Sequence, residues 1–258
     1  MDLNSEELYN FAQERYTGSR PFNGAWKDYT LLPDFPANGN ILDYTKNYDS
    51  DVLQVVRLVT QYYLTSAFQA MKIDLNDDNV KEFISDGNIG TPGRLAKLLT
   101  TSSITDMSES LAGRWTKRPR MASFPNETGR HDPVFVTTRL DAMCSHHFIR
   151  FGDDHRDKDS FVVVGYIPRE KLGGISKINR FVDWCARRGW LQENLTQYIA
   201  EEVETAFETD SVWVALINNK HGCASTRGAC DREAATTTIY ASGDFQKDPT
   251  LVPSKFRG

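Results

Sequence analysis

Two helices in direct succession, with strand-forming segments on both sides of them, constrain the fold of this chain more than any other feature. Apolar side chains at three- and four-residue steps predict helices over residues 176–188 and 191–207, and Gly189 separates them. Runs of β-branched and aromatic residues predict strands on either side of this pair, over 134–140, 161–167, 212–217 and 236–241. The pattern predicts an α+β fold in which the two helices cover one face of a mostly antiparallel sheet.

The chain before these strands has a weaker pattern. Residues 1–50 are rich in Asn, Asp, Tyr, Pro and Gly and show no period, so we expect an irregular N-terminal arm or, equally, an ordered loop. Residues 51–135 are expected to form a helical region with a loop, in which helices cover 51–72 and 93–100. Residues 136–258 would then form a separate domain that contains the sheet and its two helices.

Composition argues against several functional classes. The net charge of −5 and the pI near 5.6 are not typical of a protein that binds nucleic acid along a basic surface. No run of apolar residues is long enough to span a membrane, and the acidic N-terminus lacks the apolar segment of a signal peptide. Four cysteines in 258 residues favour the cytoplasm over a secreted disulfide scaffold.

Two short motifs combine cysteine with histidine, CSHH at residues 144–147 and HGC at residues 221–223. Thiolate and imidazole are ligands that Zn²⁺ prefers in proteins. We therefore predict a zinc site made by Cys144, His147 and Cys223. Three protein ligands leave a fourth position for water, which is typical of catalytic rather than structural zinc.

His146 and His221 are the other histidines of these motifs, and both would lie close to such an ion. Neutral imidazole near pH 7 is suited to moving protons to and from a substrate. Two other interpretations stay open at this point. In one, His146 or His221 is the fourth ligand of a structural zinc site; in the other, these cysteines and histidines are ordinary core residues.

Basic residues from three regions of the chain could bind a polyphosphate together. Lys177 and Arg180 lie at the start of a predicted helix, where free backbone N–H groups favour anions. Arg227 follows the HGC motif, and Arg94 and Lys97 lie on the helix that begins after Thr91-Pro92. Each pair alone is more typical of solvated surface charge, but the combined set is what a polyphosphate needs.

Gln192 and Glu193 stand at the start of the second predicted helix. A carboxylate can accept hydrogen bonds from N1–H and N2–H of guanine, whereas the N1 of adenine is itself an acceptor. A buried mismatch of this kind discriminates between bases by roughly 10⁴-fold. The simpler interpretation is that Glu193 only interacts with the helix dipole.

In this order, the motifs resemble those of GTP cyclohydrolase I. The resemblance rests on GTPGRLAK at 90–97, CSHHF at 144–148, GYIP at 165–168, GISKINR at 174–180, LQENLT at 191–196, HGC at 221–223, Arg227-Gly228 and GDF at 243–245. Any one of these motifs is weak, but the ordered set is highly specific. The resemblance implies the tunnelling fold (T-fold), in which subunit sheets join into a barrel, and a homodecamer of two pentamers with active sites between subunits.

The resemblance also implies a reaction, in which GTP and water give 7,8-dihydroneopterin triphosphate and formate. Water activated by zinc would attack C8 of the purine while His221 protonates N7. A second hydrolysis would release formate, and the ribose would open, rearrange and close to the pterin. His146 is the candidate for the later proton transfers.

The family's site residues transfer to this chain position by position. Zinc would be held by Cys144, His147 and Cys223, and guanine would be recognised by Gln192 and Glu193. The triphosphate would be bound by Arg94, Lys97, Lys177, Arg180 and Arg227, with Ser176 near the ribose.

Three departures from the family pattern are visible. Ser145 replaces the usual Glu, Arg150 replaces the usual Pro, and residues 153–159 form a charged insertion. None of them removes a predicted ligand. The rival interpretations are a non-catalytic zinc-stabilised T-fold scaffold, another T-fold enzyme of the 7-deazaguanine pathway, and a zinc-dependent nucleic-acid binder. Folate, biopterin and 7-deazaguanine pathways all stay open for the product.

Overall fold

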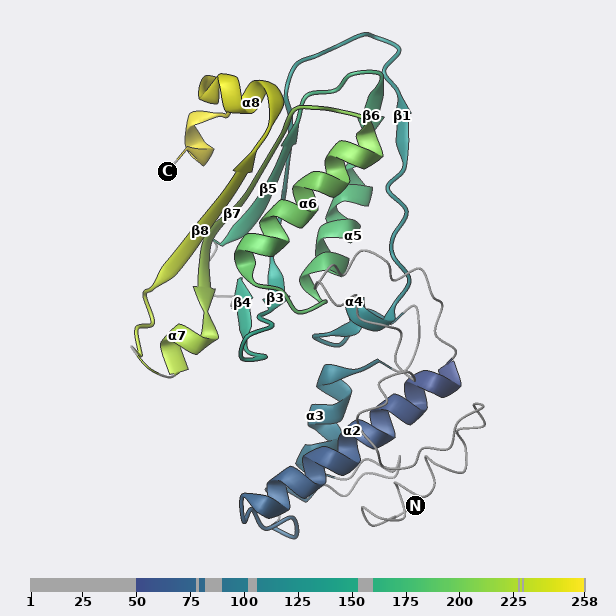
Figure 1. Ribbon diagram of the computed structural model, residues 1–258, viewed down its shortest axis with the longest axis vertical. Coiled ribbons are helices and arrows are strands. Elements are labelled where there is room, and N and C mark those ends of the chain that lie inside the picture. The colour runs from purple at the N-terminus through teal and green to yellow at the C-terminus, as the bar shows by residue number, and fades with distance from the viewer. Residues whose placement is uncertain are drawn as a thin grey trace. The chain divides into compact units, whose positions relative to one another are not determined.

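A computed structural model describes residues 50–257, apart from 78, 82–89, 102–105, 153–159, 227 and 229 (Figure 1). The predicted arm over residues 1–50 therefore lies almost entirely outside the described residues. The chain divides into two compact units, Met1–Arg118 and Pro119–Gly258. This division precedes the sequence-based boundary at residue 135, because strand β1 (Ser123–Pro125) pairs with β6 (Lys171–Gly173) of the second unit.

The first unit contains three helices among its described residues, α2 (Ser50–Ala70), α3 (Gly90–Leu99) and the short α4 (Ala112–Trp115). Both predicted helices are present, and α4 was not predicted. Helix α3 begins at Gly90 rather than at residue 93. Gly90 has φ +49°, and a Cβ there would lie 2.1 Å from the carbonyl oxygen of Val80, which accepts a hydrogen bond from Thr91 N–H.

The second unit is built on an antiparallel sheet in the order β2-β5-β7-β4-β3, with β8 also paired to β7. Its strands are β2 (Val134–Thr138), β3 (Asp141–Met143), β4 (Arg150–Gly152), β5 (Phe161–Tyr166), β7 (Val212–His221) and β8 (Ala235–Ala241). Helices α5 (Ile175–Ala186) and α6 (Gln192–Phe207) pack on one face of this sheet (Figure 1). The predicted α+β fold, with two consecutive helices on one face, is confirmed.

Apolar side chains at the predicted spacing bury the helices against the sheet. The fully buried positions are Ile178, Phe181, Val182 and Cys185 on α5 and Leu195, Ile199, Val203 and Phe207 on α6. A separate cluster joins Phe245 of α8 (Gly243–Lys247) and Phe256 to Trp213 and Val163 of the sheet. The C-terminal segment, which ends in the short helices η3 (Pro249–Leu251) and η4 (Ser254–Phe256), is thereby fixed to the strands. No helix among the described residues is long and apolar enough to cross a membrane.

Strand β7 is longer than predicted and carries the chain into the HGC motif. The prediction ended at residue 217, whereas β7 continues to His221 through an irregularity between Leu216 and Asn219. Its last residues pair with β4, so that Phe151 lies opposite His221. The sequence did not predict this extension, because its residues are mostly polar. Pairing with β4, and not composition, stabilises it as a strand.

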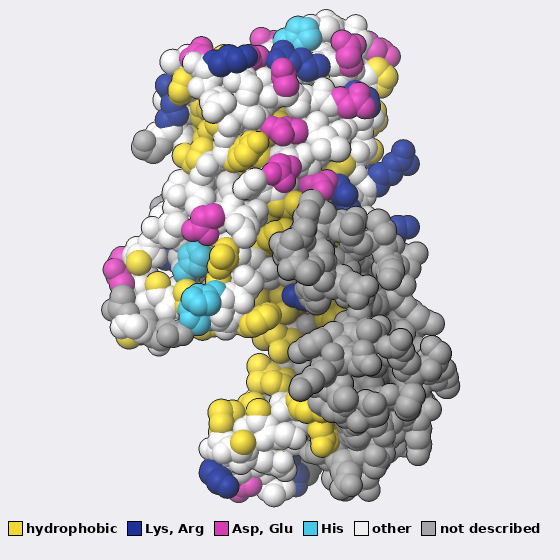
Figure 2. Space-filling view, in the orientation of Figure 1, with side chains coloured by type: hydrophobic (Ala, Val, Ile, Leu, Met, Phe, Trp, Pro, Cys, Tyr) yellow, Lys and Arg dark blue, Asp and Glu magenta, His cyan; other side chains and the backbone are white. Residues whose placement is uncertain are grey.

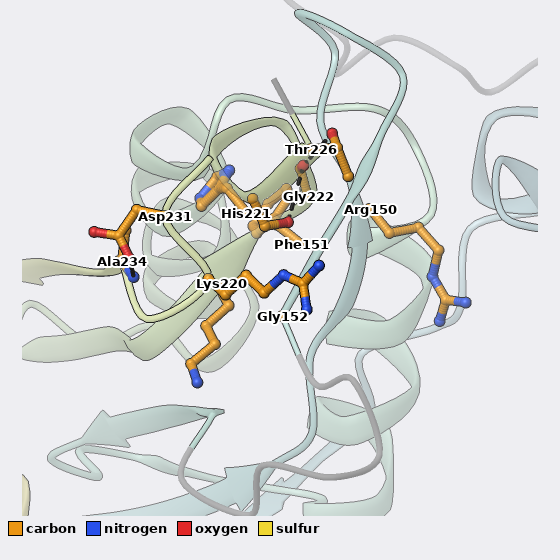
Figure 3. A pocket seen from close by; sticks show the side chains of 11 residues that line it. Arg150, Phe151, Gly152, Lys220, His221, Gly222, Thr226, Asp231 and Ala234 are labelled. Atoms are coloured by element: carbon orange, nitrogen blue, oxygen red, sulfur yellow. Dashed lines mark hydrogen bonds between the residues drawn. The ribbon is translucent and has the colours of Figure 1, made fainter. Parts of the chain in front are cut away.

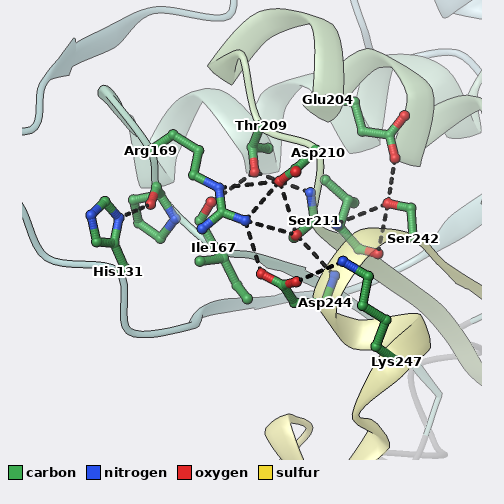
Figure 4. A network of polar contacts seen from close by, with 12 residues as sticks. His131, Ile167, Arg169, Glu204, Thr209, Asp210, Ser211, Ser242, Asp244 and Lys247 are labelled. Atoms are coloured by element: carbon green, nitrogen blue, oxygen red, sulfur yellow. Dashed lines mark hydrogen bonds and ion pairs between the residues drawn. The ribbon is translucent and has the colours of Figure 1, made fainter.

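An ion-pair network closes the opposite end of the sheet (Figure 4). The guanidinium of Arg169 donates to Asp210 Oδ1 and to Asp244 Oδ2, each at 2.8 Å. These hydrogen bonds lower the pKa of both carboxyl groups below the usual 3.8. Because Asp244 lies on α8, the network ties the C-terminal segment to the turn before β7.

Candidate active site

The CSHH motif forms a tight turn between β3 and β4. Cys144 N–H donates to the carbonyl oxygen of Ile149, and Phe148 N–H donates to that of Cys144, both at 3.0 Å. Cys144 is buried while Ser145 and His146 are exposed, and histidine side chains appear on the face drawn in Figure 2. The ring centroids of His146 and His147 are 4.0 Å apart. The turn thus presents one thiol and two imidazoles together.

The HGC motif lies directly beside this turn. The rings of His221 and Phe151 are stacked, with centroids 4.5 Å apart and planes 2° from parallel. At Gly222, a Cβ would lie 2.3 Å from Cγ2 of Ile149, the residue that ends the CSHH turn. Pairing of β4 with β7 therefore brings the two Cys/His motifs into contact, and only glycine allows an approach this close.

The start of α6 completes this group. Oε1 of Gln192 lies 2.7 Å from Nε2 of His221, and Glu193 follows as an exposed residue in the first turn. Burial lowers the pKa of His221 below its usual 6.5, and the charge of Glu193 acts in the opposite direction. Burial therefore favours the neutral ring of His221, which can accept a proton.

A cavity of about 540 Å³ opens beside His221 (Figure 3). Phe151 and Gly222 line it together with the basic residues Arg150, Lys220 and Arg232. A volume of this size is typical of small-molecule sites. Arg150, at the position where the family usually has Pro, donates from Nε to Asp141 Oδ1 at 2.8 Å across the β3–β4 pair.

The donor set of the two motifs fits zinc by its chemistry. Two thiols and one imidazole come from the CSHH turn, which holds Cys144 and His147, and from the short helix α7 (Gly222–Thr226), which holds Cys223; the two lie against each other, and Nδ1 of His147 is buried. Within the part of the chain that the structure describes, no three His, Cys, Asp or Glu side chains are grouped closely enough to hold a metal ion. The three-ligand site therefore stays a proposal.

The residues of α5 that were predicted to bind the triphosphate lie far from His221 within one chain. A Cβ at Gly173 would lie 2.3 Å from the ring of Phe207, so α5 begins beside the last residue of α6. Gln192 is the first residue of that 16-residue helix, about 24 Å along its axis. Ser176, Lys177 and Arg180 are thus not grouped with His221 in the single chain.

The remaining basic candidates lie in the first unit or outside the described residues. Arg94 and Lys97 are exposed residues of α3 in the first unit, where Lys97 lies 3.8 Å from Glu109. Arg227 and the insertion at 153–159 lie outside the described residues.

The positions and contacts of Gln192 and Phe151 differ most from what the sequence predicted. We expected Gln192 to face guanine, but it is only 1% exposed and its amide contacts His221 and neighbouring backbone. Phe151 was not predicted as part of the site. Its role depends on the β4–β7 register, which no local sequence signal reveals.

Replacing Gly222 by alanine tests the contact between the two motifs. We expect destabilisation by about 1–3 kcal/mol, because the new methyl group would collide with the stiff β-branched Ile149. The thermal unfolding temperature and the turnover rate should both decrease. In the double variant Gly222→Ala/Ile149→Ala, the collision with Cγ2 is removed. The loss of stability should therefore be smaller than the sum of the losses in the two single variants. Strictly additive effects would contradict the contact.

The antiparallel sheet, its helix pair and the Cys/His turns at one end of the sheet define a T-fold enzyme. A family model described as GTP cyclohydrolase I matches residues 68–257. The chain belongs to the GTP cyclohydrolase I family, as its motifs predicted, and is an enzyme of that family.

Curated relatives agree with this assignment. GTP cyclohydrolase 1 of Photobacterium profundum is 30% identical over 199 residues, which are 77% of this chain and 82% of that protein. GTP cyclohydrolase 1 of Shewanella denitrificans is 29% identical over 194 residues, covering 75% and 79%. The crystal structure of the archaeosine synthase QueF-Like in the apo form matches with a TM-score of 0.32 at 22% identity, over 43% of this chain and 94% of that chain.

Proposed function

We propose that this enzyme converts GTP and water to 7,8-dihydroneopterin triphosphate and formate. The observation that carries the proposal is the contact of three motifs with one another around His221. The CSHH turn, the HGC turn and the start of α6 are far apart in sequence, yet Phe151, His221 and Gln192 link them directly.

Cys144, His147 and Cys223 would hold the zinc ion, and when bound it supplies Lewis acidity for hydrolysis. The ring of His221 borders the cavity, and it would take a proton from the attacking water and pass it to N7 of the purine. His146 is exposed on the neighbouring turn and is the candidate for later proton transfers. Glu193, also exposed, would accept hydrogen bonds from N1–H and N2–H of guanine.

A second copy of the chain would complete the site. Ser176, Lys177 and Arg180 lie at the far end of the helix layer from His221, so a neighbouring subunit has to supply them. Strand β8 supports such an assembly, because it is a mostly exposed edge strand that another sheet can extend. We propose a homodecamer of two pentamers with joined sheets, in which Arg94, Lys97 and Arg227 also bind the triphosphate.

The domain division is proposed along the same lines. Residues 119–258, which contain all the described strands, would form the catalytic domain, and the described part of residues 50–118 would form a helical region. The four cysteines, two of them proposed as zinc ligands, favour a cytoplasmic enzyme.

Product analysis tests the proposed function. The purified full chain, supplied with Zn²⁺, is incubated with GTP while formate and pterin fluorescence are measured in the same sample. We expect equal amounts of formate and pterin from GTP and none from ATP. A protein that binds zinc but releases no formate from GTP would instead be a non-catalytic scaffold.

A further inference from the structure

The side-chain amide of Gln192 can adopt only one orientation. Its Nε2 lies 3.1 Å from the carbonyl oxygen of Thr236, 3.1 Å from Oγ1 of Thr238 and 3.5 Å from the carbonyl oxygen of Leu216. Carbonyl oxygens only accept hydrogen bonds, so the atom that faces them has to be the NH₂ group. The flipped amide would place Oε1 against two carbonyl oxygens in a buried site.

The neighbouring hydroxyl groups agree with this orientation. Oγ1 of Thr196 donates to the main-chain oxygen of Gln192 at 2.8 Å and lies 2.6 Å from Oγ1 of Thr238. Thr238 can then donate to Thr196 while it accepts from the amide of Gln192. Each of the two hydroxyl groups then donates to one acceptor, and the amide of Gln192 donates to the carbonyl oxygen of Thr236 and to Thr238, so the arrangement is internally consistent.

The fixed amide determines which nitrogen of His221 carries the proton. Oε1 of Gln192 is an acceptor only, and it lies 2.7 Å from Nε2 of His221. Nε2 therefore carries hydrogen in the neutral ring, and the lone pair is on Nδ1. Stacking on Phe151, which is 3% exposed, holds the plane of the same ring.

We propose that Gln192 is a positioning residue that holds His221 in its Nε2–H form, so that Nδ1 is the atom that exchanges protons with the substrate. Gln192 would then act through His221 and would not recognise the base. This inference deepens the proposed function and rests on it for its kinetic consequences, whereas the tautomer itself can be measured without turnover.

Nitrogen-15 NMR of the imidazole rings tests the tautomer in the full-length wild-type chain at about pH 8, where histidine is neutral. His221→Ala identifies the His221 signals by their absence. We expect the proton on Nε2 and a lone pair on Nδ1. A proton on Nδ1 would overturn the proposal, whether or not the protein turns over GTP.

Steady-state kinetics test the positioning role. In Gln192→Leu, we expect kcat for GTP to fall by about 10- to 100-fold with KM changed less than about threefold, because the ring is still present but no longer held. Gln197→Leu is the matched control, since Gln197 is an exposed glutamine of α6 that contacts Glu201. A raised KM with unchanged kcat would show that Gln192 binds the base and would refute positioning. A wild-type chain inactive on GTP would refute the proposed function and leave the NMR result to decide on the tautomer.

Discussion

Replacing Cys223 by serine is expected to remove bound zinc and to reduce GTP turnover by about 10³-fold or more. The serine hydroxyl stays protonated at neutral pH and is a poor ligand compared with thiolate. Cys223 is half-buried in the short helix α7, which follows His221, and contributes no predicted proton transfer of its own. Zinc content by atomic emission and formate release, measured on the same sample, check both effects.

Cys230→Ser is the matched control for this experiment. Cys230 is exposed and follows Cys223 in the same connection between β7 and β8, but it belongs to neither Cys/His motif. The control should retain zinc and turnover. If Cys223→Ser kept a full complement of zinc, the proposed ligand set would be wrong.

Replacing His221 by alanine is expected to lower kcat by about 10²- to 10⁴-fold while leaving zinc content unchanged. The substitution removes the imidazole that borders the cavity, but it leaves all three proposed ligands in place. Metal analysis and single-turnover measurement of formate release separate the two properties. Because formate release follows attack at C8, the block should appear before any pterin forms.

His131→Ala provides the control for His221→Ala. His131 lies before β2, with Nδ1 2.8 Å from the carbonyl oxygen of Pro168, at the end of the sheet that carries the Arg169 network. Its loss should leave turnover close to that of the wild type. If His221→Ala lost zinc instead of proton transfer, His221 would be a fourth ligand and the site structural.

Local signals were sufficient to predict the helix pair and most of the sheet. Gly189 separates α5 from α6, and fully buried residues such as Ile178 and Ile199 occupy the spacing that predicted each helix. Strand β1 was missed because its three residues are stabilised only by pairing with β6, and nothing in the segment around Phe124 signals that pairing.

The site was predictable as a set of motifs but not as an arrangement. The chemistry of cysteine and histidine singled out residues 144–147 and 221–223, and the structure brings these two turns together. Contacts across the sheet could not be predicted in the same way. The roles of Gln192 and Phe151 depend on how α6 and β4 meet the end of β7, which is a long-range property of the fold.

The structure describes two of the three departures from the family pattern, Ser145 and Arg150. Ser145 is exposed at the CSHH turn. Arg150 begins β4 and pairs with Asp141 on β3, which stabilises the hairpin that carries the turn. Neither residue displaces a proposed ligand.

Anomalous X-ray diffraction at the zinc absorption edge, from crystals of the zinc-loaded full chain, tests the central claim most directly. The claim is that the CSHH and HGC turns share one catalytic ion. We expect one anomalous peak per chain, bonded to the sulfurs of Cys144 and Cys223 and to the imidazole of His147, with no fourth protein ligand. A peak elsewhere, or a fourth side chain bonded to the ion, would contradict it.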